Sequence, residues 1–315
     1  MGYLCKECGR DFGLRRSLHI HVVRNHDITV KEYYENNYPK KDLLTGERIP
    51  YKSYLKYREQ DFVSPENELE WINKSSSLVV SSYILDKMKH KKKEKGLIYA
   101  PPDLYFKIYN LPGVSKYEEI FGSYCEFINQ AELKHNFLDD LPEDFWAKTP
   151  EVPTLIDTRE RQPLEFNGAR SQKLDFGDYT AAGEFYSKTF VERKGEDDFK
   201  STFTQWQERF NKEMERCVEF NSYMFVVVES TVEKINRNDG FRKVRLNFLW
   251  HGVRELITKY PHNLQFIFAH SRAGAQRIIP KILYYGKSLW NVDLNYEIDK
   301  RTRELILRKE HVGKR

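Results

Sequence analysis

The pattern of apolar and polar positions changes near residue 150, and the second half of the chain predicts a sheet covered by helices. Short apolar runs of strand length alternate there with longer segments in which apolar residues recur at helical spacing. Expected strands begin at Thr154 and cover Lys188–Lys194, Tyr223–Glu229 and Leu264–Ala269, and expected helices cover Val244–Tyr260 and Ala273–Tyr285. The run at Tyr223 is continuously apolar, as expected for a strand buried on both faces. This alternation predicts a three-layer α/β domain over residues 150–286.

A further helix is expected after Asp198. Six apolar residues recur there at helical spacing: Phe199, Phe203, Trp206, Phe210, Cys217 and Val218. The spacing predicts one helix with a single buried stripe, and it places Cys217 in the core.

The chain before residue 150 is polar and rich in tyrosine, and its helix signals are short. Thr29-x-x-Glu32 and Ser115-x-x-Glu118 have the spacing of a capping box, in which two side chains satisfy the first free amides of a helix. These signals predict a mainly helical region before the α/β domain. The resulting division is a small N-terminal module at 1–28, a polar helical region with a basic linker at 29–95, a small helical repeat at 96–138, the α/β domain at 150–286 and a C-terminal helix at 287–315.

The first 28 residues contain a metal-ligand pattern. Two cysteines are separated by two residues and two histidines by four, with twelve residues between the pairs: Cys5, Cys8, His21 and His26. Thiolates and imidazoles at these intervals predict a closed tetrahedral Zn²⁺ site that joins a knuckle to a short helix. Phe12 and Leu18 supply the small apolar core that such a unit needs beside its metal. The segment resembles a two-Cys two-His zinc finger.

The residues of this segment identify its metal more clearly than its binding target. The resemblance puts the base-reading positions on Leu14, Ser17 and Ile20, which offer little hydrogen bonding to base edges. Arg15 and Arg16 are suited to phosphate contacts instead. The finger is therefore expected to position the protein on DNA, with protein binding as the alternative.

Charge is distributed unevenly along the chain. Residues 1–95 carry 19 Lys and Arg against 14 Asp and Glu, and residues 151–315 carry 29 against 24, so each has a net charge of +5. Residues 96–150 carry 4 against 9, a net charge of −5. Six lysines gather within Lys87–Lys95, and the central three are expected to contact DNA phosphates: Lys91, Lys92 and Lys93. A solvated linker without a partner is the alternative.

Composition also limits the cellular setting. No run of about 18 apolar residues is present, so no membrane contact is expected. The N-terminus lacks the pattern of a signal peptide, and two of the four cysteines belong to the metal pattern. We expect an intracellular protein, cytoplasmic or nucleoid-associated and not secreted.

The candidate chemistry lies within the α/β domain. Side chains alternate between the faces of a strand, so Glu192 and Lys194 are expected on one face and Arg193 on the other. Asp157 at the end of one expected strand and Asp178 in a turn are expected to join them. Carboxylates hold hard divalent cations such as Mg²⁺ or Mn²⁺, and a neighbouring lysine can orient water or balance phosphate charge.

These residues resemble the signature of the XPF-type nuclease family over about Val152 to Gly286. The signature is Gly-Asp followed by Glu-Arg-Lys-x-x-x-Asp, and here it reads Gly177-Asp178 and Glu192-Arg193-Lys194-Gly-Glu-Asp-Asp198, after Asp-x-Arg-Glu at Asp157–Glu160. The resemblance implies a restriction-enzyme-like core, metal ligands at Asp157, Asp178 and Glu192, and a catalytic lysine at Lys194. It also implies a structural or DNA-side role for Arg193.

A second resemblance concerns residues 111–124, which are similar to the small helical repeat found beside homing endonuclease domains. Together the two resemblances imply a metal-dependent DNA endonuclease that cuts double-stranded DNA at specific sites. A structure-selective repair or recombination nuclease is the first alternative, and a non-catalytic DNA-binding protein is the second. The sequence leaves open whether two copies act together as a homodimer.

Overall fold

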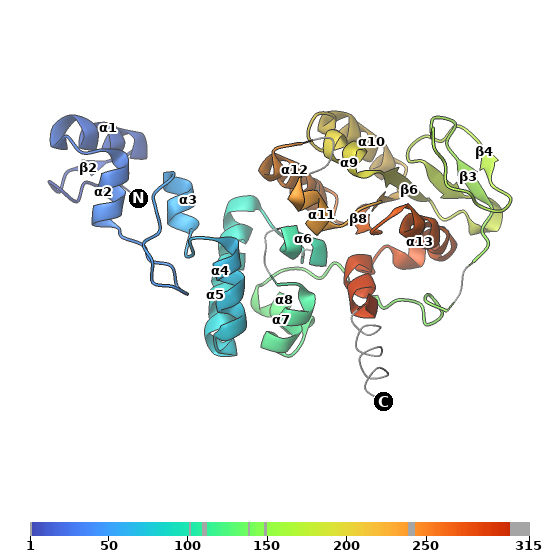
Figure 1. Ribbon diagram of the computed structural model, residues 1–315, viewed down its shortest axis with the longest axis horizontal. Coiled ribbons are helices and arrows are strands. Elements are labelled where there is room, and N and C mark those ends of the chain that lie inside the picture. Colours follow the sequence, from blue (N-terminus) through green and yellow to red (C-terminus); the bar gives the residue numbers. More distant parts are fainter. Residues whose placement is uncertain are drawn as a thin grey trace. The chain divides into compact units, whose positions relative to one another are not determined.

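The computed structural model describes residues 2–100, 102–108, 112–137, 139–147, 150–238 and 243–302. The chain divides into two compact units, Met1–Val80 and Ser81–Arg315 (Figure 1). Within the described ranges, every helix is too short or too polar to cross a membrane.

The first unit begins with a small hairpin and continues with short helices. Its elements are β1 (Tyr3–Leu4), β2 (Asp11–Phe12), α1 (Arg15–His26), α2 (Val30–Asn37), α3 (Tyr54–Glu59) and α4 (Pro65–Lys74). Leu18 and Val22 on α1 are buried in one core with Tyr33 and Tyr34 on α2. The unit therefore gains an aromatic core that extends well beyond the zinc-ligand segment.

The expected capping box at Thr29 is confirmed. The Thr29 hydroxyl accepts the Glu32 amide at 3.2 Å, and the Glu32 carboxylate accepts the Thr29 amide at 2.8 Å. These two bonds satisfy free amides at the start of α2.

The second unit contains a six-stranded mixed sheet. Its strands are β3 (Thr154–Ile156), β4 (Arg170–Ser171), β5 (Tyr179–Ala181), β6 (Thr189–Lys194), β7 (Tyr223–Val228) and β8 (Leu264–Phe268). The spatial order is β4-β3-β5-β6-β7-β8, with β5 antiparallel to both neighbours and β6, β7 and β8 parallel.

Helices cover both faces of this sheet (Figure 1). Alternate residues of β7 point to opposite sides: Met224 and Val226 lie in one core, and Phe225 and Val227 lie in the other. The first core is closed by α9 (Glu196–Thr202), α10 (Gln207–Glu219), α11 (Val232–Arg237) and α12 (Leu246–Lys259), and the second by α13 (Arg272–Tyr285). The predicted three-layer α/β fold is confirmed, and it is consistent with a restriction-enzyme-like core.

The prediction of one buried helical stripe after Asp198 is wrong. The segment forms two helices, α9 and α10, and the side chain of Trp206 between them is 59% exposed, while Val218 is 40% exposed. The Ser201 carbonyl accepts hydrogen bonds from the amides of Thr204, Gln205 and Trp206. This irregular turn ends α9, so the buried face of α10 does not continue the helical spacing of α9. Cys217 is buried as predicted.

The expected helical repeat contains α6 (Asp103–Ile108), α7 (Val114–Phe121) and α8 (Tyr124–Gln130). Its first helix is part of the core on one face of the six-stranded sheet, because Leu104, Tyr105 and Ile108 pack in the cluster that includes residues of α12. Before it, α5 (Ser77–Lys95) carries the six lysines to its C-terminal end.

The prediction that Ser115 caps the next helix is wrong. The N-cap of α7 is Gly113, and Ser115 lies inside the helix. The Asp103 carboxylate accepts the Val114 amide at 2.7 Å, so a side chain from α6 satisfies the free amide instead. At the other end of the unit, η2 (Gly286–Leu289) leads to a helix over residues 294–302, and the remainder of the expected C-terminal helix lies outside the described residues.

Candidate active site

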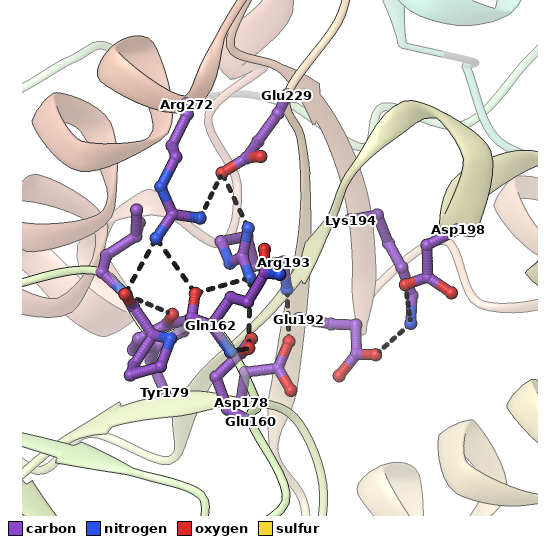
Figure 2. A network of polar contacts seen from close by, with 12 residues as sticks. Glu160, Gln162, Asp178, Tyr179, Glu192, Arg193, Lys194, Asp198, Glu229 and Arg272 are labelled. Carbon is purple, nitrogen blue, oxygen red and sulfur yellow. Dashed lines mark hydrogen bonds and ion pairs between the residues drawn. The ribbon is translucent and has the colours of Figure 1, made fainter. Parts of the chain in front are cut away.

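The centre of the candidate site is the C-terminal end of β6. Glu192 and Lys194 extend to one side of this strand and Arg193 to the other, as the strand alternation predicts (Figure 2). Lys194 Nζ lies 2.5 Å from Glu192 Oε1 and 3.2 Å from Asp198 Oδ2 on the first turn of α9. Strand and helix thus place a lysine between two carboxylates.

Asp178 is brought to the same strand end by a tight turn. Gly177 has φ of +67°, and a Cβ there would lie 3.2 Å from the Val191 carbonyl, so only glycine fits without strain. The Asp178 amide donates to the Val191 carbonyl at 2.8 Å, and its carboxylate accepts the Arg193 amide at 2.7 Å. The Gly-Asp pair therefore fixes a carboxylate beside β6.

The surroundings of Asp178 and Glu192 disfavour the charged form of both carboxyl groups. Burial, and next the charge of Glu192, raise the pKa of Asp178 well above its usual range. Burial also raises the pKa of Glu192, although Lys194 opposes that shift. Burial alone would lower the pKa of Lys194, but the charges of Glu192 and Asp198 outweigh it and raise this pKa. The lysine is therefore a fixed cation at neutral pH.

Sequence reasoning missed Glu213. This residue lies on α10, and its carboxylate accepts the Gly177 amide at 3.0 Å, beside Asp178. Its charge also contributes to the raised pKa of Glu192. The position follows the signature by 15 residues on a helix, and the one available signal was helical periodicity, which placed it next to the apolar stripe.

A pocket of about 280 Å³ is bordered by Glu192, Lys194, Asp198 and Glu213. It is lined by residues of β6, α9 and the first two turns of α10: Glu192, Lys194, Asp198, Ser201, Thr202, Trp206, Arg209, Phe210 and Glu213. Among the lining residues Glu192 is buried and Glu213 is half-buried, whereas Asp198, Trp206 and Arg209 are exposed.

Asp157 has a different environment. It is buried, and its two oxygens accept the guanidinium of Arg159 at 2.7 and 2.9 Å, the Arg159 amide at 2.7 Å and the Leu174 amide at 2.7 Å. Burial would raise the pKa of Asp157, but these hydrogen bonds lower it. A role for Asp157 as a metal ligand stays a prediction, and it requires Arg159 to release the carboxylate.

Arg193 lies in a second ionic network on the opposite side of β6 (Figure 2). Its guanidinium contacts Glu229 at 2.8 Å, Glu160 at 3.1 Å and the Gln162 carbonyl at 2.9 Å, and its side chain is 9% exposed. Arg272 donates to the same carbonyl at 3.0 Å. This network ties the loop after β3 to the sheet. The expected DNA contact of Arg193 stays a prediction.

The donor set fits a hard divalent cation. Asp178 and Glu192 supply oxygen ligands, and their raised pKa values show that Lys194 alone does not offset the burial and mutual repulsion of these carboxylates. Among the described residues, however, the three predicted ligands Asp157, Asp178 and Glu192 do not form a group whose oxygens all lie within 4.8 Å. Any cation here would first be held by Asp178 and Glu192.

The four cysteine and histidine residues of the first unit do converge. Cys5, Cys8, His21 and His26 place their ligand atoms within 4.8 Å of one another. Cys5 Sγ lies 3.6 Å from His26 Nε2, Cys8 Sγ lies 3.2 Å from His21 Nε2, and the two Nε2 atoms are 3.2 Å apart. A tetrahedral zinc ion with ordinary bond lengths requires separations of roughly 3.3–3.8 Å. The group therefore fits zinc.

The residues predicted to contact phosphates differ in their exposure to solvent. Arg16 and Lys93 are exposed, whereas the Arg15 guanidinium lies 4.3 Å from the ring centre of Tyr54. On the last turns of α5, Lys91 and Lys92 are half-buried, and Lys92 pairs with Glu132 at 3.2 Å. These DNA contacts stay predictions.

Comparison with known proteins adds two similar structures. No protein family and no curated protein matches the chain. XPF from Aeropyrum pernix is 19% identical with a TM-score of 0.33, over 42% of this chain and 66% of that one. XPF from Aeropyrum pernix in complex with DNA is 18% identical with a TM-score of 0.32, over 42% and 63%. The chain thus spans just under two thirds of these structures, and its function is inferred from its own residues.

Proposed function

We propose that the protein is a metal-dependent DNA endonuclease that hydrolyses phosphodiester bonds. The observation that carries the proposal is the group of Asp178, Glu192 and Lys194 at one end of β6, of which Glu192 and Lys194 line a pocket of about 280 Å³. A pair of carboxylates that repel each other, next to a fixed ammonium, suits a cation and the anionic phosphate that it would polarise.

Each residue has a distinct part in this proposal. Asp178 and Glu192 would hold Mg²⁺ or Mn²⁺, which supplies Lewis-acid activation of the phosphate and of a water. Lys194 is held protonated by Glu192 and Asp198, so it acts as a hydrogen-bond donor and counter-charge to the phosphate and not as a base. Asp157 would join the ligands once Arg159 is displaced.

A non-catalytic role is less well supported. Burial of mutually repelling carboxylates costs stability, and a protein without catalytic function gains nothing from keeping both. Asp178, Glu192 and Lys194 are all retained in one cluster. Their retention favours an enzyme.

We also propose that the first unit directs the enzyme to specific sites in double-stranded DNA. The support is the zinc-type geometry of its four ligands and the exposed Arg16 beside them on α1. The alternative is a structure-selective nuclease whose cuts follow flaps and forks whatever the sequence.

The first experiment tests cleavage. Linear plasmid DNA is incubated with the purified protein, with and without added Mg²⁺ or Mn²⁺, and without a chelator because a chelator would also remove zinc. We expect cleavage only with the added metal, and loss of it in Asp178→Asn with DNA binding retained. Equal cleavage by Asp178→Asn would falsify the assignment.

The second experiment distinguishes the two kinds of specificity. Genomic DNA is digested and the ends are mapped, with synthetic flaps and forks digested in parallel. A shared sequence at the ends supports site-specific cutting. Ends without a shared sequence, together with efficient flap cleavage, support the structure-selective alternative.

A further inference from the structure

Glu213 on α10 reaches the turn that carries Asp178. Its carboxylate accepts the Gly177 amide at 3.0 Å, and within the described ranges its second oxygen has no hydrogen-bond partner. The next residue of the turn, Asp178, is held by strands, because its amide donates to the Val191 carbonyl and its carbonyl accepts the Asp157 amide, both at 2.8 Å. Glu213 therefore ties the same turn to a helix.

Packing on both sides of this hydrogen bond fixes the place of the Glu213 carboxylate. Phe210 lies one turn before it on α10 and Met214 directly after it, and both are buried in the core on one face of the sheet. Phe176, which directly precedes Gly177, is buried in the same core. Close-packed side chains leave little freedom to the groups attached to them, so helix and turn hold each other in one arrangement.

The hydrogen bond alone does not account for the charge of Glu213. A glutamine would accept the Gly177 amide equally well through its amide oxygen. The carboxylate lines the same pocket as Glu192, and after burial its charge is among the causes that raise the pKa of Glu192. Together with the hydrogen bond to Asp157, the charge of Glu213 also raises the pKa of Arg159. Glu213 thus adds a negative charge close to both groups.

We propose that Glu213 is a positioning residue of the candidate nuclease site, which fixes the turn at Asp178 and adds a third negative charge beside the cation that Asp178 and Glu192 would hold. The inference rests on the proposed nuclease function and extends its site to α10. Among the described residues, the oxygens of these three carboxylates do not all lie within 4.8 Å of one another, which favours positioning over direct ligation by Glu213. Hard cations are bound through the charge and the fixed place of nearby oxygens, so both effects should alter metal affinity.

The test measures metal binding by the full-length protein without DNA. Mn²⁺ is the probe, and the free ion is measured by electron paramagnetic resonance. Zinc binds thiolates and imidazoles more tightly than Mn²⁺ does, so the zinc-type group of the first unit stays closed to the probe, and zinc content is checked in every variant. Asp178→Asn identifies the Mn²⁺ bound at the candidate site, because binding there should be weakened in this variant.

Two substitutions separate the hydrogen bond from the charge. Glu213→Gln keeps an acceptor for the Gly177 amide and should weaken Mn²⁺ binding by about threefold, the effect of one half-buried charge. Glu213→Ala removes both and should weaken binding by about tenfold, because a charge-assisted hydrogen bond is lost as well. Glu215→Gln is the matched control, since Glu215 is exposed on the same helix, pairs with Lys259 and does not line the pocket. It should bind Mn²⁺ like the wild type.

The single-turnover rate of DNA cleavage supplies a second readout. At saturating Mg²⁺, Glu213→Gln should cleave close to the wild-type rate, because a higher cation concentration compensates for the missing charge. Glu213→Ala should stay slow under the same conditions, because the cation does not restore the place of Asp178. DNA affinity should be the same for both variants and the wild type. Melting curves recorded in parallel keep all comparisons at temperatures where each variant is folded.

The outcomes separate this inference from the proposed function. Wild-type Mn²⁺ affinity in Glu213→Ala, with Asp178→Asn weakened, overturns the positioning role and leaves the proposed metal site intact, even where the melting temperature of Glu213→Ala falls. Wild-type affinity in Glu213→Gln beside a weakened Glu213→Ala overturns the third charge and supports the hydrogen bond. If Glu213→Ala does not fold, Glu213→Gln decides, and wild-type affinity there overturns the proposal. If Asp178→Asn binds Mn²⁺ as tightly as the wild type, the proposed metal site is wrong and the inference fails with it.

Discussion

At the scale of single residues, Glu192 is buried and Asp178 is half-buried, and each holds its proton more tightly than a free carboxyl group. The sequence predicted that Glu192 and Lys194 share one side of a strand because strand alternation is local. It did not predict Glu213, nor the four hydrogen bonds that occupy Asp157, because both depend on segments brought together by folding.

The raised pKa of Asp178 leads to a stability prediction. A carboxyl whose pKa is raised in the folded state stabilises the protein below its unfolded pKa, and this contribution is lost as pH rises through the folded pKa. Without added metal at pH 8, Asp178→Asn removes the repulsion and should raise the melting temperature of the second unit by at least about 2 °C. Differential scanning fluorimetry at pH 5 and pH 8 measures it. A rise that is no larger at pH 8 than at pH 5 would contradict the account.

At the scale of elements, the strands and the long helices α12 and α13 could be predicted because their patterns are long and regular. The division between α9 and α10 could not, since three amides gathered at the Ser201 carbonyl interrupt a pattern that reads as one helix. Likewise, the cap of α7 comes from Asp103 on another helix, which no local spacing reveals.

Asp103 also belongs to an acidic contact between α6 and the C-terminal segment. Asp293 accepts the Asp103 amide at 2.6 Å and the Tyr296 amide at 3.2 Å, while Lys107 pairs with Asp103 at 2.8 Å and with Asp299. Burial, and next the charge of Asp103, raise the pKa of Asp293 to about 7. The contact is therefore most favourable at low pH and weakens as pH rises through 7.

This contact predicts a pH-dependent effect of Asp293→Asn. The amide oxygen can still accept both backbone amides but carries no charge, so the variant avoids the repulsion that the wild type acquires above pH 7. The melting temperature of Asp293→Asn relative to wild type should increase by about 2 °C or more between pH 6 and pH 8. Thermal melts at the two pH values check this, and a constant difference would count against it.

At the scale of the whole molecule, the chain consists of two compact units, and the zinc-type group found among the described residues lies in the first. Sequence spacing was sufficient to identify those ligands, because the finger pattern is confined to 22 residues, from Cys5 to His26. It was not sufficient to show that α6 packs into the core of the α/β sheet, since that contact joins distant segments.

The zinc assignment predicts an independent loss of structure in the first unit. Cys8→Ser should reduce zinc content from about one ion per chain to near zero and unfold the finger, because the metal supplies most of its folding energy. Cys125→Ser is the control, since Cys125 is also an exposed free cysteine but lies outside the ligand group. Zinc analysis with thermal melts tests this. If gently purified wild-type protein contains no zinc, the assignment is wrong.

The most direct test of the proposed nuclease is the single-turnover rate of DNA cleavage in Mg²⁺ for Glu192→Gln. The substitution keeps the shape of the side chain and removes its charge, and a metal contribution of several kcal/mol corresponds to a loss of roughly 10³-fold. Glu219→Gln, exposed at the end of α10, is the control and should cleave at the wild-type rate. We predict this loss with DNA binding and zinc content unchanged. Cleavage by Glu192→Gln at the wild-type rate would contradict the account.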